Sequence, residues 1–272
     1  MLKITIGQYY HADSFIHKLD ARMKLLCTVI FITVLFFVGN FLGYGLAAIY
    51  LAIIIRVSKV PPKFLFRGLR AILFIIVFTA FLNIFFTQGG NVVVQVGFVR
   101  VTELGLINAA RMGIRLVMLI IGSSILTLTT TPIQLTDAIE FSLKPFKRIG
   151  VPAHEIAMMM TIALRFIPTL IEEMDKIMKA QMARGADFDT GGIIRKARSL
   201  VPLLVPLFIS SFRRADDLAL AMESRCYRGD MGRTRMKQMK MKWRDYQALS
   251  VLAIFTALVF VLEYFANIWG IM

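Results

Sequence analysis

The 272-residue sequence has few of the residues from which catalytic and metal sites are built. It contains two cysteines, Cys27 and Cys226, and three histidines, His11, His17 and His154. So few cysteines exclude a disulfide framework and a cysteine-built metal cluster. The sequence also lacks an HExxH zinc motif, a GxxxxGK[ST] phosphate loop and a GxSxG nucleophile elbow. We therefore expect a chain that is not itself an enzyme and that holds no metal or cofactor of its own.

Acidic residues are also scarce compared with basic ones. The chain has 17 Asp and Glu against 32 Lys and Arg, a net charge of +15, yet 57% of its residues are hydrophobic. That apolar content exceeds what one soluble core of this size needs, so the composition indicates a membrane protein. Residues 1–24 mix polar and apolar side chains, and we expect no removable signal peptide there.

The first long apolar segment runs from Leu25 to Ile55 without a charge. A spanning helix needs about 20 residues, whereas one helix of this length would reach about 46 Å. A single helix would also put its two basic flanks on opposite sides of the membrane, which the positive-inside rule disfavours. Gly39, Asn40 and Gly43 lie at the midpoint and predict a turn between two short helices.

Three further segments are long enough to cross the bilayer: Ala71–Phe86, Leu104–Leu128 and Tyr246–Trp269. Residues 88–103 contain a turn signal and a β-branched alternation, which predicts a short extracellular hairpin or extended loop. We predict an all-α polytopic membrane protein with about five transmembrane helices plus long amphipathic cytoplasmic helices. Residues 1–128 form the membrane region with four crossings, 129–245 the cytoplasmic region and 246–272 the final transmembrane helix. In the cell membrane the N-terminus is then cytoplasmic and the C-terminus extracytoplasmic.

Three charged residues fall inside the predicted crossings. Arg111 and Arg115 lie one turn apart near the outer half of the fourth crossing, and Glu263 lies near the outer end of the last. Charges within a membrane often mark function. The simpler interpretation of the two arginines is that they extend to the outer interface, and the sequence leaves both interpretations open.

The cytoplasmic region is predicted to contain a series of helices. Thr131 before Pro132 predicts a helix that ends near Leu143, and a long amphipathic helix follows from Pro152, with a kink expected at Pro168. The apolar run Ser199–Phe212 is too short to cross and contains two prolines. We expect this run to lie along the inner interface or to be buried against its neighbours, and a separate helix to follow from about Phe212 to Arg225.

Two of these helices are predicted to end in an arginine. One arginine at a helix end needs no partner, because it favours the negative pole of the helix dipole. Two such ends in one region also suit insertion into two acidic grooves of another protein. Gly185 suits a left-handed helix stop, whereas Cys226 has a Cβ, so we expect the second helix to continue toward Gly229 or to end without that cap. The candidate site residues are Ala183, Arg184, Gly185, Ser224, Arg225 and Cys226.

Several motifs resemble the transmembrane T component of energy-coupling factor transporters, over nearly the whole chain. The opening of that family is similar to Gly7-Gln8-Tyr9-Tyr10, Ser14 and His17-Lys18-Leu19-Asp20-Ala21-Arg22. Its coupling helices resemble Leu164-Arg165-Phe166-Ile167-Pro168, Gln181-Met182-Ala183-Arg184-Gly185 and Arg214-Ala215-Asp216-Asp217-Leu218-Ala219-Leu220-Ala221-Met222-Glu223. Family members carry two Ala-Arg-Gly-type motifs. The first is complete here, and the second reads Ser224-Arg225-Cys226.

The resemblance implies a non-catalytic scaffold of an ATP-driven importer. Its partners would be two ATP-binding-cassette ATPase subunits, which bind the ATP, and a substrate-binding membrane subunit for vitamins or transition-metal ions. The alternatives are a self-contained secondary transporter or channel, a membrane-embedded enzyme and a nucleic-acid binder. The first three crossings contain no charge, which disfavours a transporter acting alone. The basic residues before the last crossing suit orientation and contact with anionic lipid rather than nucleic acid.

Overall fold

The computed structural model describes residues 9–87, 89, 92–96, 99–186, 188, 192–229 and 240–269. The chain divides into two compact units. The first comprises Met1–Ala138 together with Gln238–Met272, and the second comprises Ile139–Lys237. Each unit is described by itself.

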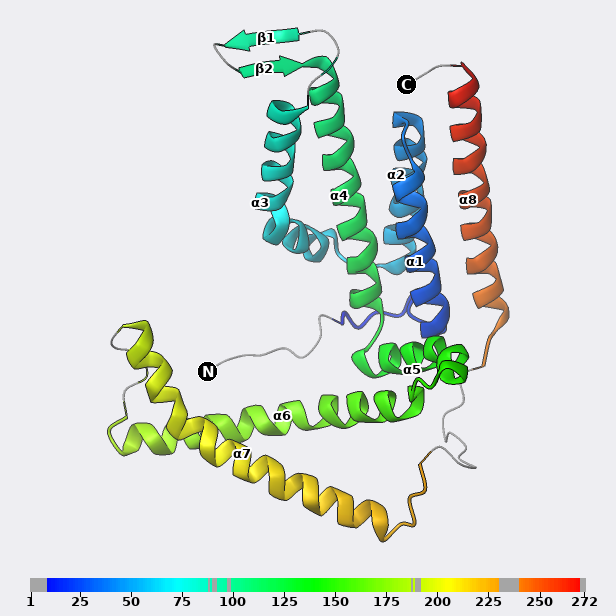
Figure 1. Cartoon of the computed structure of the whole chain (residues 1–272). Helices are drawn as coiled ribbons and strands as arrows, with labels where there is room; N and C mark the ends of the chain where they lie inside the picture. The colour runs from blue at the N-terminus through cyan, green and yellow to red at the C-terminus, as the bar shows by residue number, and fades with distance from the viewer. Residues whose placement is uncertain are drawn as a thin grey trace. The chain divides into compact units, whose positions relative to one another are not determined.

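The first unit is a helical bundle with a small β-hairpin. Its helices pack around α4, which contacts α1, α2 and α3, while α8 contacts α1 and α2 (Figure 1). Strands β1 and β2 pair antiparallel between α3 and α4, as the alternating valines predicted. The elements are α1 (Ala21–Phe37), α2 (Phe41–Ser58), α3 (Pro62–Phe86), β1 (Val92–Val96), β2 (Val99–Thr102), α4 (Glu103–Thr129) and α8 (Trp243–Trp269).

The all-α polytopic architecture predicted from the sequence is confirmed. Helices α2, α4 and α8 are long and apolar enough to cross a membrane, and α3 qualifies as a broken span with a bend of 56° between its two parts. The predicted turn within Leu25–Ile55 separates α1 from α2. Helix α1 has 17 residues, which is at the short end of the range for a spanning helix. Helix α6 of the second unit also meets the length and composition requirement, although its sequence pattern predicted an amphipathic helix.

The core of the bundle is aromatic at its centre. The ring of Tyr50 stacks on Phe255 with centroids 4.3 Å apart, and Phe31 packs against both rings. Gly122 of α4 lies against Phe31, and a Cβ there would approach the ring to 2.7 Å. The absence of a side chain at Gly122 therefore lets α4 pack closely against α1.

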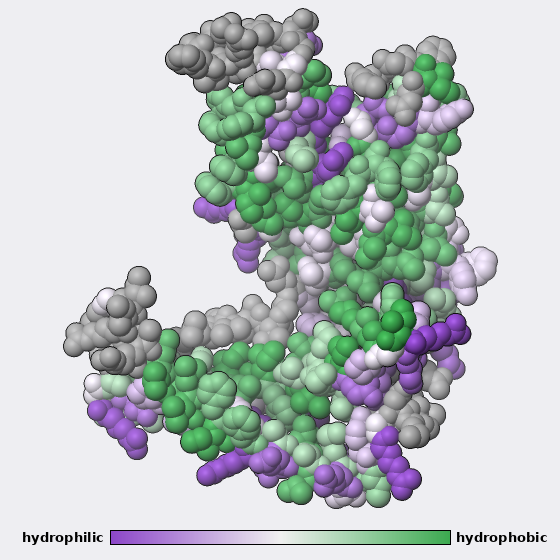
Figure 2. Space-filling model, in the orientation of Figure 1, coloured by the Kyte–Doolittle hydropathy of each residue, from purple (hydrophilic) through white to green (hydrophobic). Residues whose placement is uncertain are grey.

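The face of the bundle that Figure 2 shows is largely hydrophobic. Phe36, Phe74 and Phe86 are each more than half exposed. Contiguous apolar surface of this kind is unfavourable in water and suits contact with lipid.

The second unit consists of helices joined by short connections. Helix α5 (Pro132–Leu143) crosses the boundary between the units and has the predicted bounds. The N–H of Gln134 donates to the Thr131 hydroxyl, and the Gln134 side chain accepts from the Thr131 N–H, so the two form a capping box. A 3₁₀-helix (Lys144–Ile149), α6 (Ala153–Ala183) and α7 (Ile193–Glu223) follow.

Helix α7 differs from the sequence-based expectation. The prediction divided this stretch near Phe212, but the structure has one continuous helix that contains Pro202 and Pro206. The prolines are four residues apart and therefore share one face, so backbone hydrogen bonds are lost on one side of the helix only. Helix α6 likewise continues through Pro168.

Candidate coupling site at two arginine-tipped helices

The first predicted site lies at the C-terminal end of α6. Arg184 is the C-cap residue, and Gly185 follows with a φ of 88°. The N–H of Gly185 donates to the carbonyl of Met182, and the N–H of Ala186 donates to that of Gln181. These two bonds form a Schellman motif, which ends the helix abruptly and leaves Arg184 at its tip.

The second predicted site, at the end of α7, has the same geometry. The N–H of Cys226 donates to the carbonyl of Glu223, and the N–H of Tyr227 donates to that of Met222. Cys226 adopts a φ of 54°. The expectation that its Cβ would prevent a left-handed cap is therefore wrong. A side chain disfavours this backbone conformation by roughly 1–2 kcal/mol, but the two cap hydrogen bonds hold Cys226 in it.

Both arginines are exposed at their helix ends. Their flanking residues Ala183, Gly185, Ser224 and Cys226 are exposed as well. Arg225 directly precedes the left-handed residue of the second cap, just as Arg184 directly precedes the left-handed residue of the first cap. Each tip thus presents a guanidinium on a rigid support, and a guanidinium can bind a carboxylate with two hydrogen bonds.

Helices α6 and α7 cross each other (Figure 1), and a polar cluster joins them there. Arg214 of α7 donates to the carboxylate of Glu173 of α6 across 3.0 Å. The hydroxyl of Ser210 donates to the other oxygen of the same carboxylate. The guanidinium of Arg214 also lies 5.7 Å from the centre of the Phe166 ring. The crossing is therefore fixed by an ion pair, a hydroxyl bond and a cation–π contact.

The sequence pattern did not predict this cluster. The amphipathic pattern of α6 has Glu173 on its polar face beside other charged residues, whereas the structure half-buries Glu173 against α7. Arg214 belongs to a motif that the sequence did single out, but its partner lies on another helix. Periodicity describes the faces of one helix and does not say which faces meet.

The N-terminal segment forms a second ordered cluster, in the first unit. His17 contacts the Ser14 hydroxyl through Nδ1 at 2.7 Å and the Tyr10 carbonyl through Nε2 at 2.9 Å. The carbonyl can only accept, so Nε2 carries the proton and Nδ1 accepts from Ser14. The N–H of Tyr10 donates to the carbonyl of Leu128 near the end of α4. Burial lowers the pKa of His17 below its ordinary value of 6.5.

Two charged residues tie this segment to the ends of three helices. Lys24 is 6% exposed, and its ammonium donates to the carbonyl of Thr129 at 2.8 Å and to that of His17 at 3.2 Å. The buried carboxylate of Asp245 accepts from the N–H of Asp20 and from that of Lys242. The motif residues from Tyr9 to Arg22 therefore join the start of α1, the end of α4 and the start of α8.

The charges inside the predicted crossings hold the turn between α1 and α2. Arg115 donates to the Tyr44 hydroxyl at 3.1 Å and to the Val38 carbonyl at 2.8 Å. Glu263 of α8 accepts from the backbone N–H groups of Gly39 and Asn40. The carboxylate and the guanidinium thus satisfy backbone groups that the two helix ends leave free.

The two arginines of α4 therefore differ in surroundings. Arg115 is bonded to the turn and does not merely extend to an interface. Arg111 lies 5.4 Å from the centre of the Phe41 ring, and within the described part of the chain its buried Nε has no hydrogen-bond partner.

Comparison with known proteins agrees with this architecture. The family model described as cobalt transport protein, CbiQ, matches residues 12–239. The energy-coupling factor transporter transmembrane protein EcfT of Thermosediminibacter oceani is 58% identical over 248 residues, which cover 91% of this chain and 93% of the relative. The protein of the same name from Clostridium kluyveri is 57% identical over 268 residues, covering 98% and 97% of the two chains.

A more distant relative matches over a similar length. EcfT of Bacillus subtilis is 44% identical over 263 residues, which cover 97% of this chain and 99% of the relative. The relatives are named as transmembrane subunits of transporters, in agreement with the apolar helices of the first unit. The chain belongs to the family of energy-coupling factor transporter transmembrane proteins.

Proposed function

We propose that this chain is the scaffold and energy-coupling subunit of an ATP-driven importer for vitamins or metal ions. In this function, Arg184 and Arg225 each bind an acidic groove of one of two ATPase subunits. The ATPases bind and hydrolyse ATP, and this chain contributes no catalytic group. The observation that carries the proposal is the pair of exposed arginines on identical helix caps.

The spacing between the helix crossing and the two arginine tips supports a lever-like motion. We call the part of each helix between the crossing and its tip an arm. Glu173 and Arg184 are eleven residues apart on α6, and Arg214 and Arg225 are eleven residues apart along α7 and its cap. At about 1.5 Å per residue, each arm is roughly 16 Å long from the crossing to its tip. Arms of equal length, joined at one ion pair, suit a partner that pulls both tips symmetrically. When ATP draws the two ATPases together, the tips move and the angle at the crossing changes.

The exposed apolar face of α7 supports contact with a membrane subunit. Its apolar side chains repeat at intervals of three and four, so they form one continuous stripe along the helix. A stripe of this kind is unfavourable in water and suits the substrate-binding subunit or the bilayer surface. The stripe comprises Val201, Leu204, Val205, Phe208, Ile209 and Phe212, each at least 46% exposed.

In this proposal the second unit lies in the cytoplasm. The connections to it leave after α4 and return before α8, where basic residues gather: Arg22, Arg56, Lys59, Lys242 and Arg244. The positive-inside rule places that end of the bundle in the cytoplasm. The N-terminus is then cytoplasmic and the C-terminus extracytoplasmic.

Charge reversal at the tips tests the proposal. Arg184→Glu together with Arg225→Glu places carboxylates against acidic grooves, and we expect the ATPases to be lost on co-purification and ATP-dependent uptake to be abolished. Where such an arginine–carboxylate pair is buried in the complex, truncating the arginine costs roughly 2–5 kcal/mol of binding free energy. Normal assembly and uptake by the double variant would disprove the proposal.

A matched control separates the tips from charge in general. Arg228 lies three residues beyond Arg225 and is also exposed, but it is outside the cap. We expect Arg228→Glu to leave assembly intact.

Uptake by this chain in vesicles without ATPases would instead favour a self-contained transporter.

A further inference from the structure

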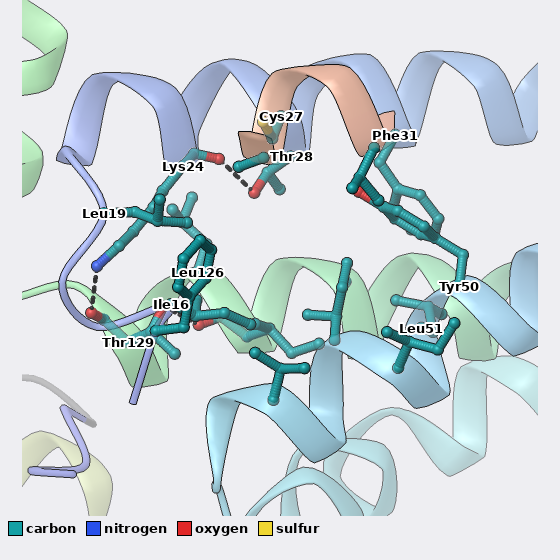
Figure 3. Close-up of a pocket in the computed structure, with 18 of the residues that line it drawn as sticks. Ile16, Leu19, Lys24, Cys27, Thr28, Phe31, Tyr50, Leu51, Leu126 and Thr129 are labelled. Carbon is teal, nitrogen blue, oxygen red and sulfur yellow. Dashed lines mark hydrogen bonds between the residues drawn. The ribbon is translucent and has the colours of Figure 1, made fainter. Parts of the chain in front are cut away.

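The helical bundle contains an apolar cavity of about 260 Å³. Helices α1, α2, α4 and α8 line it, and the N-terminal segment closes one end through Ile16 and Leu19 (Figure 3). Phe15 also belongs to the lining. The wall is mostly aliphatic and aromatic. A dry cavity of about 150 Å³ already takes up benzene, so a cavity of this size holds a sizeable apolar group.

The cavity opens on the side of the bundle, between α2 and α8. Ile53 and Val57 of α2 and Val251 of α8 line it and are 55%, 41% and 54% exposed, so they form its rim. On a bundle that spans the membrane, this opening faces lipid. It lies toward the basic end of the bundle, where α2 ends and α8 begins.

Basic side chains lie beside this opening. Arg244 precedes Gln247, Ala248 and Val251 by three, four and seven residues, so it shares their face of α8 one turn closer to the helix start. Arg56 follows Ile53 by three residues at the end of α2. Both arginines are exposed. The opening therefore joins an apolar interior to a cationic margin.

We propose that this cavity is a binding site for one phospholipid. One acyl chain enters between α2 and α8 and lies against Phe31, Tyr50 and Leu51, and the phosphate binds Arg244, with Arg56 adding positive charge. The site is separate from the arginine tips and does not depend on the function proposed for them.

The enclosure of the cavity and the charge beside its opening favour a lipid over a helix of another protein. Four helices and the N-terminal segment already line the cavity, so a flexible acyl chain can enter it between α2 and α8. A guanidinium at the margin also matches a phosphate, which an apolar helix does not offer.

Photo-crosslinking of the full chain in vesicles tests the location. The probe is phosphatidylglycerol with a diazirine on one acyl chain. We expect crosslinked peptides to concentrate at the cavity wall, in residues 24–31, 50–57 and 247–251. Crosslinks spread evenly over exposed lipid-facing positions such as Phe36 and Phe74 would overturn the proposal.

Native mass spectrometry of the delipidated chain, titrated with phosphatidylglycerol, tests the residues. Ala248→Phe fills the cavity wall and should abolish the one-lipid adduct, while Ala253→Phe on an exposed, non-lining position of α8 should retain it. Arg244→Gln removes a charge-assisted contact and should weaken binding about tenfold. Equal adducts in both phenylalanine variants would overturn the site. Equal binding of diacylglycerol with the same chains would overturn the role of the phosphate.

Discussion

Glu173 of α6 and Arg214 of α7 form an ion pair of 3.0 Å at the crossing of the two helices. Glu173 and Arg214 are 41 positions apart in the sequence, and so are Arg184 and Arg225. The ion pair therefore joins equivalent positions of two similar helices. The side chains of Glu173 and Arg214 are 24% and 29% exposed, so the ion pair is partly shielded from water. In the proposed function this ion pair is the pivot of the two arms.

Weakening the pivot should uncouple the arms without affecting their tips. Glu173→Gln removes the charge that Arg214 contacts, and we expect a loss of about 1–2 kcal/mol of stability and reduced uptake. The ATPases should still co-purify, because both arginine tips remain. Thermal unfolding and uptake assays measure these effects. The neighbouring exposed Glu172→Gln is the control, and an equal effect of both variants would contradict the role of Glu173.

The cap at Cys226 should be improvable. Cys226→Gly removes the Cβ from a left-handed position, and we expect the end of α7 to gain about 1 kcal/mol. Gly185→Ala should destabilise the end of α6 by a similar amount, because Gly185 has a φ of 88°. The space around Gly185 is open, so the loss comes from the backbone conformation and not from a steric clash. Hydrogen exchange of the amides at each tip measures both changes.

Gly192→Ala provides the control for the cap variants. This glycine has a φ of −70° and no atom near its would-be Cβ, and it caps the start of α7, so the substitution should leave exchange at the two C-terminal tips unchanged. If Cys226→Gly accelerated exchange at its tip, the strained-cap interpretation would fail.

Gly122 should not tolerate a larger side chain. A Cβ at Gly122 would lie 2.7 Å from the buried ring of Phe31, which Tyr50 and Phe255 hold in place. We expect Gly122→Ala to destabilise the bundle by about 1–3 kcal/mol, as overpacking does. Gly113→Ala in the same helix meets no atom within 4 Å and should not destabilise the bundle, because alanine is the better helix former. Unfolding temperatures in detergent compare the two, and identical values would contradict the close packing.

His17 should make stability depend on pH. Burial lowers the pKa of folded His17 below 6.5, so the unfolded chain takes up this proton at a higher pH. The stability that neutral His17 contributes is complete above pH 6.5 and is lost as the pH falls through its folded pKa. His17→Gln should flatten this part of a melting-temperature profile, whereas exposed His11→Gln should not. An unchanged profile in the His17 variant would refute the assignment.

The sequence predicted the helices and their ends better than their contacts. The turn near Asn40, the helix start at Pro132 and the stop at Gly185 follow from local residue preferences, and the structure has all three. These features depend on neighbouring residues alone. For the same reason the sequence located Arg184 at a helix end, whereas at Arg225 it left open whether the helix continues toward Gly229.

The failures of prediction are of two kinds: local preferences that the folded chain overrides, and contacts between residues far apart in the sequence. Two prolines predicted a break in α7, but the structure keeps one helix there. The Cβ of Cys226 predicted the loss of a cap that backbone hydrogen bonds nevertheless form. The bond between Glu263 and Asn40 joins residues 223 positions apart, and no local pattern indicates it.

The central claim is that both arginine tips bind ATPase subunits. A cryo-EM map of the assembled complex in its membrane tests this claim most directly, because it shows the surroundings of each tip. We predict that Arg184 lies in an acidic groove of one ATPase and Arg225 in the corresponding groove of the other. A map in which either tip is surrounded by solvent, with no ATPase in contact, would contradict the account.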